Sequence, residues 1–61
     1  MFVAKMFHDG QDFFARGVNW TSNIKTATLF VTLPEALAGA EKIRAENKAS
    51  QDKTIEIVNL D

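Results

Sequence analysis

The residues of this 61-residue chain that could do chemistry begin with its single histidine. His8 is followed directly by Asp9, with Asp12 nearby, and a histidine oriented by a carboxylate can act as a general base. However, Asp9-Gly10 is the strongest short signal for a tight hairpin turn, because both central residues of a type I′ turn need positive φ. We therefore interpret His8 and its acidic neighbours as an exposed turn without a cleft or a nucleophile.

Metal, phosphate and thiol chemistry have less support. Asp9, Gln11 and Asp12 offer oxygen ligands, but a calcium loop needs more acidic ligands at regular spacing and a closing glutamate. The three glycines, at positions 10, 17 and 39, are too scattered for a phosphate-binding loop. The chain has no cysteine, which excludes a thiol nucleophile, a thiolate zinc site and disulfides. We expect a protein without catalytic activity, cofactor or metal.

Aromatic residues beside basic ones form the last candidate group. Phe7 and Phe14 could stack single-stranded bases while Lys5 and Arg16 contact phosphates. The chain has seven basic and eight acidic residues, a net charge of -1, with the two signs interspersed. Nucleic-acid binders usually carry a basic surplus. Single-stranded nucleic-acid binding is therefore the alternative hypothesis, ranked below protein binding.

A hairpin positions these residues. Residues 1–7 alternate as a strand, and 12–18 form the return strand after the Asp9-Gly10 turn. With Asp9 and Gly10 as the loop, counting outward places Met6 opposite Phe13 and Lys5 opposite Phe14. The register divides the hairpin into two faces.

A connector from Trp20 to Ala36 follows the hairpin, and we expect it to pin a helix onto the sheet. It holds one helix-start signal at 21–23 and a second at 32–35. Ile24 and Phe30 are expected to close one end of the core, and Trp20 is interpreted as a lid on that core.

The second signal, Thr32-Leu33-Pro34-Glu35, is typical of a capping box and begins the main helix. The residues expected on its buried stripe are Leu33, Ala36, Leu37, Ala40 and Ile43. Gly39 interrupts this helix, and close approach of another chain is the one explanation that we find for it. A polar loop at 47–53 leads to a last strand at 54–60.

These elements predict a single α+β domain over residues 1–61, with the order ββαβ. A right-handed crossover places the last strand beside the first. The expected architecture is a three-stranded antiparallel sheet, in the order 2-1-3, with one helix packed on one face.

One helix covers only one face of such a sheet. The covered face carries Phe2, Ala4, Met6, Phe13, Ala15, Ile55 and Ile57. The other face carries Val3, Phe7, Phe14, Val18, Val58 and Leu60, interrupted by Lys5, Arg16 and Glu56. This exposed apolar face predicts a homodimer or a docking surface for another protein. Two alternatives stay open: the register is shifted by one residue, which exchanges the faces, or the connector folds over part of this face.

The size of the chain favours a partner. A domain of 61 residues buries a modest share of its surface and is marginally stable, and here no disulfide supports it. No apolar run is long enough to span a bilayer, and residues 1–7 are too short and too polar for a signal peptide. We expect a cytoplasmic protein with no membrane contact.

The pattern Trp20-Thr21-x-x-Ile24-x-x-Ala27-x-Leu29-Phe30-x-Thr32-x-x-Glu35-Ala36, with a hairpin before it and a strand Ile55-Glu56-Ile57-Val58 after it, resembles that of many short proteins of tailed phages and prophages. Most such proteins have no assigned function. Those that are understood often bind and block a host protein, so the resemblance implies a phage accessory protein or inhibitor acting in the host cytoplasm.

The sequence thus predicts a small binding module that contacts a protein partner or its own copy. The residues predicted to make the contact are Val3, Lys5, Phe7, Phe14, Arg16 and Val58.

Overall fold

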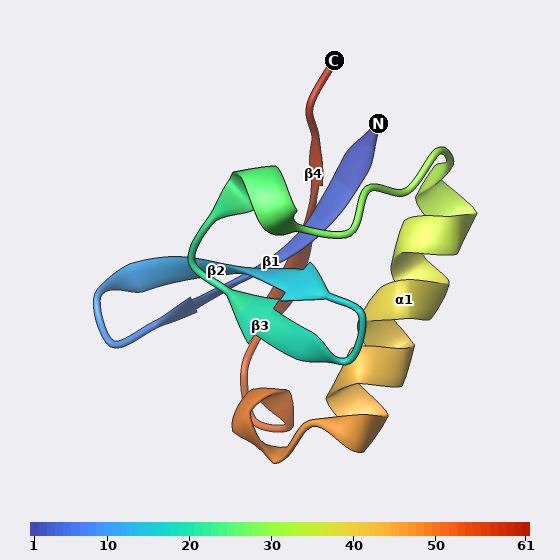
Figure 1. Cartoon of the computed structure of the whole chain (residues 1–61). Helices are drawn as coiled ribbons and strands as arrows, with labels where there is room; N and C mark the ends of the chain where they lie inside the picture. The colour runs from blue at the N-terminus through green and yellow to red at the C-terminus, as the bar shows by residue number, and fades with distance from the viewer.

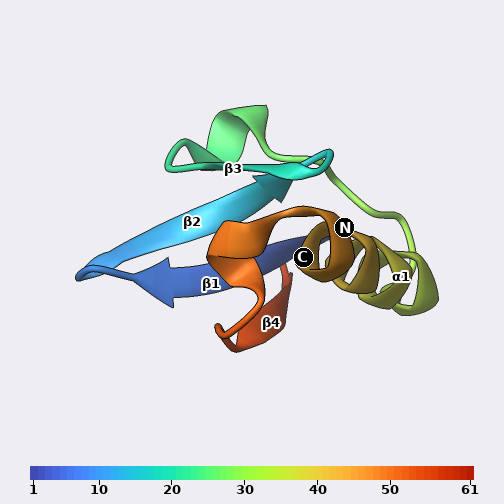
Figure 2. The ribbon, with the colours of Figure 1, turned by 90° about the horizontal axis from the view of Figure 1, so that it is seen from below.

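The computed structural model describes all 61 residues as a sheet with one long helix on one face (Figure 1). The elements are β1 (Phe2–His8), β2 (Gln11–Arg16), β3 (Asn19–Thr21), η1 (Ile24–Thr26), α1 (Leu33–Glu46), η2 (Lys48–Ser50) and β4 (Ile55–Asn59). The sheet is antiparallel in the order β3-β2-β1-β4. Figure 2 shows the four strands following one another in this order, with α1 to one side. The α+β class is confirmed, but the sheet has four strands and not three.

The first hairpin forms as its turn residues predict. Asp9 and Gly10 both have positive φ, 54° and 78°, as a type I′ turn requires. Met6 faces Phe13 and Lys5 faces Phe14, which is the predicted register. The alternative of a one-residue shift is therefore wrong.

The fourth strand, β3, was not predicted. Gly17 has a φ of 62°, and it forms a two-residue turn with Val18 that brings Asn19 opposite Arg16. A hairpin turn with glycine at its first central position is a type II′ signal. Gly17 therefore reverses the chain, and Trp20 joins the sheet.

Residues 28–30 then run between β2 and β1. The Thr28 N–H donates to Ala15 O (2.9 Å), and Phe30 exchanges two 2.8 Å hydrogen bonds with Phe2. β1 and β2 are paired only near their shared turn, so this segment occupies the gap where the two strands separate. The connector thereby crosses the sheet layer to reach α1.

The main helix begins at its predicted cap. Thr32 Oγ1 accepts a hydrogen bond from the Glu35 N–H (3.3 Å), while no return bond from the Glu35 carboxylate forms, so half of the expected capping box is present. The buried helix residues are Ala36, Ala40 and Ile43. Leu33 and Leu37 were also expected on this stripe, but both are exposed. The buried stripe is narrower than predicted because α1 leaves its flank beside β4 uncovered.

The core is small and built largely from alanine. Its central cluster consists of Ala4, Ala15, Ala40 and Ile43, with Trp20, Ile55 and Ile57 packed against it. Packing of Trp20 against this core is confirmed. Ile24 was expected to close one end of the core, but its side chain is 40% exposed because η1 lies on the other side of the sheet. In total, eight of 61 residues are buried, which is little support for an isolated domain.

Candidate protein-binding surface

The face of the sheet opposite α1 carries most of the predicted contact residues. Lys5 faces Phe14 on β2 and Glu56 on β4, and side chains that face each other across a ladder share a face. We call this surface the open face and define it by Lys5, Phe7, Phe14, Arg16, Glu56 and Val58. The structure thus brings five of the six predicted contact residues to one surface.

Val3 is the exception. It shares this side of the sheet with Val58, which faces it across the ladder, but it has no exposed surface. The connector folds over this side, since Thr26 of η1 hydrogen-bonds through its hydroxyl to Thr21 (3.1 Å). The prediction that Val3 contacts a partner is therefore wrong, and the alternative that the connector covers part of this face is confirmed in part.

Phe7 is the most accessible apolar residue of the open face. Its side chain is 63% exposed, because it lies near the hairpin turn and beyond the reach of η1. Its facing residue on β2 is Asp12, which provides no apolar cover. Phe14 and Val58 are half-buried. Among the six residues that define the open face, the most exposed apolar side chain therefore lies at the hairpin end.

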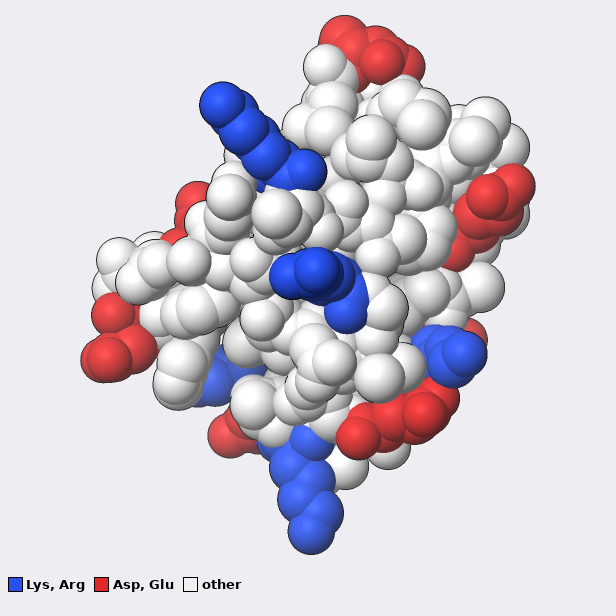
Figure 3. All heavy atoms as spheres, viewed as in Figure 1, with Lys and Arg blue, Asp and Glu red and all other residues white.

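The charges of the open face are mixed. Lys5 Nζ lies 3.9 Å from Asp12 Oδ2, and Glu56 faces Lys5 on the other side. Arg16 is exposed at the far end of β2 and has no acidic partner. On the side of the molecule that Figure 3 draws, which is not the open face seen face-on, basic and acidic side chains are likewise interspersed. This arrangement lacks the continuous basic groove that tracks a nucleic-acid backbone.

His8 lies on the opposite face of β1 from Phe7, and of its acidic neighbours only Asp12 lies on the same side as the open face. His8 is exposed at the hairpin end, with its ring centroid 6.4 Å from that of Phe13. No group of three or more histidine, aspartate or glutamate side chains is placed to hold a metal ion. His8 thus ends β1 directly before the exposed Asp9-Gly10 turn.

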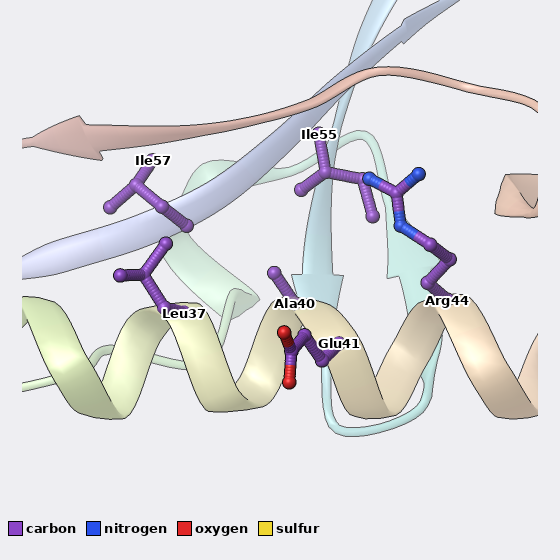
Figure 4. A pocket seen from close by; sticks show the side chains of 6 residues that line it. All are labelled: Leu37, Ala40, Glu41, Arg44, Ile55 and Ile57. Atoms are coloured by element: carbon purple, nitrogen blue, oxygen red, sulfur yellow. The ribbon is translucent and has the colours of Figure 1, made fainter.

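A groove between α1 and β4 is the second surface feature. Its volume is about 410 Å³, and its lining residues are Leu37, Ala40, Glu41, Arg44, Ile55 and Ile57 (Figure 4). Leu37 lies beside Ile57, while Arg44 extends towards Ile55. Sequence reasoning missed this groove because it placed Leu37 in the core. The available signal was the strand order itself, since a single helix cannot fully cover the edge strand.

No protein-family model matches this chain, and no curated protein or solved structure is significantly similar to it. With 14 residues, α1 is the longest helix, and none is long and apolar enough to cross a bilayer.

Proposed function

We propose that this protein is a small non-catalytic module that binds another protein through the open face. The observation that carries the proposal is the 63% exposure of Phe7 beside the half-buried Phe14. Burying a large apolar side chain contributes about 1.5 to 3 kcal/mol. Apolar side chains rimmed by charges are typical of protein interfaces. In this arrangement, Phe7 and Phe14 supply the apolar contact, and Lys5 and Arg16 supply the rim.

The proposed partner is a host protein, which the bound module would block. This part of the proposal is supported by the resemblance of the Trp20 to Ala36 pattern to short phage and prophage proteins. Those small phage proteins that are understood often act by binding and blocking a host protein. A rigid sheet face can do so without a catalytic group.

The proposal is tested with immobilised baits in a lysate of the source cell. The baits are wild type, Phe7→Asp and Val31→Asp. Val31 is a matched control because its side chain is 65% exposed, like that of Phe7, but belongs to the connector. The proposal is supported by a lysate protein that wild type and Val31→Asp retain and that Phe7→Asp does not. After purification, this lysate protein must also bind wild type and Val31→Asp more tightly than Phe7→Asp. If the Phe7→Asp bait retains the same protein as strongly as wild type does, the proposal is overturned.

Single-stranded nucleic-acid binding makes a different prediction. It requires affinity that falls steeply with salt and weakens with Arg16→Ala, since phosphate contacts depend on counterion release. The pairing of Lys5 with Asp12 leaves Arg16 as the one unpaired cation of the open face. A titration with labelled single strands at low and high salt distinguishes the two functions.

A further inference from the structure

The outer edge of β4 has free backbone groups. The Leu60 N–H donates to Met1 O (2.9 Å), so Leu60 and the alternate residues Val58 and Glu56 direct their backbone groups towards β1. The intervening residues, Ile55, Ile57 and Asn59, therefore direct theirs away from the sheet. β4 has no second neighbouring strand, and no loop or side chain bonds to these outward groups.

This edge has little of the usual protection against pairing, since Glu56 is its one charged residue. Proteins block edge strands with proline, bulges, lysine or a covering loop. β4 has five residues, Ile-Glu-Ile-Val-Asn, without proline or lysine. The opposite edge, β3, has only three residues. β4 is thus the longer and more accessible edge for an added strand.

We propose that a second copy of this chain pairs antiparallel with β4, with a two-fold axis at Ile57, to form one continuous eight-stranded sheet. In this register Ile57 faces Ile57 of the second copy, and Ile55 faces the second copy's Asn59. All three outward residues of one copy meet outward residues of the other, which gives six backbone hydrogen bonds. The edge is therefore complementary to itself.

The charges that flank β4 favour this register. Lys53 lies two residues before Ile55, and Asp61 lies two residues after Asn59, so the antiparallel register brings Lys53 to the same end of the paired strands as the second copy's Asp61, at both ends. The Asp61 carboxylate also lies 2.7 Å from the N-terminal amine of its own chain. A register centred on Glu56 would instead place two glutamates opposite each other, which is destabilising. Of these two registers, charge complementarity favours the one centred on Ile57.

The groove supplies the apolar contact. Ile57 points to the α1 side, where Leu37 lies beside it and is 51% exposed (Figure 4). The two-fold axis brings these side chains next to their counterparts and buries them. A chain with only eight buried residues gains core by this association. Pairing at this edge is independent of the proposed function, and it leaves both open faces on the same side of the sheet.

The test is sedimentation equilibrium of the full chain from micromolar to millimolar concentration. We expect wild type to change from the mass of one chain to that of two. Asn59→Pro removes an outward N–H from each copy without removing a bond to β1, and should weaken the dimer about tenfold or more. Leu37→Asp should weaken it similarly, whereas Leu29→Asp, a control residue with 50% exposure on the connector, should not. A wild-type monomer at all concentrations, or a folded Asn59→Pro variant that dimerises as tightly as wild type, would overturn the proposal.

A disulfide experiment tests the register without relying on Asn59→Pro. Because the chain has no cysteine, any disulfide in a single-cysteine variant joins two chains. Glu56 and the second copy's Val58 form a non-hydrogen-bonded pair with Cα atoms about 4.5 Å apart, within disulfide range. A mixture of Glu56→Cys and Val58→Cys should cross-link faster than either variant alone. Equal cross-linking in the three samples would contradict the register.

Discussion

The ring of Phe30 occupies the space that a side chain at position 39 would need. A Cβ added to Gly39 would lie 2.4 Å from Phe30 Cζ and 2.7 Å from Cε1. The ring cannot easily retreat, because the Phe30 backbone is bonded twice to Phe2. Gly39 thus lets the connector pack against α1 within one chain, and the close approach of another chain that we considered from the sequence is not needed to explain it.

This packing predicts that Gly39→Ala destabilises the protein although alanine favours helices. Alanine should contribute about 1 kcal/mol of helix propensity, while overpacking costs about 1 to 3 kcal/mol. We expect a net loss of about 1 kcal/mol in urea unfolding followed by circular dichroism. In a Phe30→Leu background, which lacks the clashing ring atoms, Gly39→Ala should become stabilising. Equal effects in the two backgrounds would contradict the proposed contact.

A second prediction concerns Asn47, which ends α1 and joins it to the β2–β3 turn. Its Nδ2 donates to Val18 O (3.0 Å), and its Oδ1 accepts from the Ala49 N–H (3.0 Å). Asn47→Ala should lower the free energy of unfolding by about 1 to 3 kcal/mol, since the part-buried carbonyl loses its partner. Asn47→Asp should not restore it, because a carboxylate accepts at Ala49 but cannot donate to Val18.

Asn23 provides the control for that measurement. Its Oδ1 makes the same kind of capping bond, to the Lys25 N–H at 3.0 Å, but its side chain donates no bond to a distant part of the chain. Asn23→Ala should cost clearly less than Asn47→Ala. Similar losses at the two asparagines would assign the effect of Asn47 to local capping alone.

The parts of the fold that are set by residues close together in the sequence were predictable. Asp9-Gly10 sets the first hairpin and its register because the turn type is a local backbone property. Thr32 likewise sets the start of α1. β3 was missed although Gly17-Val18 carries a local turn signal, because the residues after it are few and are followed by helix-start signals.

No pattern in the residues around Val3 indicates that its side chain is buried. This burial depends on where the connector crosses the sheet, which is set by contacts between distant segments such as Phe2 with Phe30. The grouping of Lys5, Phe7 and Phe14 was predictable since it follows from the hairpin register alone. The groove at Leu37 was not, because helical periodicity gives the buried stripe but not how far the helix reaches across the sheet.

A third prediction separates the two halves of the helix cap. Thr32→Ala should lower the free energy of unfolding by about 1 kcal/mol, because the Glu35 N–H loses its acceptor. Glu35→Gln should change it by less than about 0.5 kcal/mol, since no hydrogen bond of the Glu35 carboxylate is lost and only its interaction with the helix dipole weakens. Thermal unfolding of the two variants measures the difference. A larger loss for Glu35→Gln than for Thr32→Ala would show that the cap acts through the glutamate.

The last prediction concerns Trp20, whose indole Nε1 is buried and has no hydrogen-bond partner. A buried donor without a partner costs about 1 to 3 kcal/mol. Trp20→Phe removes this donor while keeping an aromatic ring against the core. The stability lost with the smaller contact area and the stability gained by removing the unpaired N–H should therefore nearly cancel. We expect unfolding free energies within about 1 kcal/mol of wild type for Trp20→Phe, and a loss of about 3 kcal/mol or more for Trp20→Ala. If Trp20→Phe proves as damaging as Trp20→Ala in urea unfolding, the indole N–H contributes to stability through a bond to solvent or to another molecule.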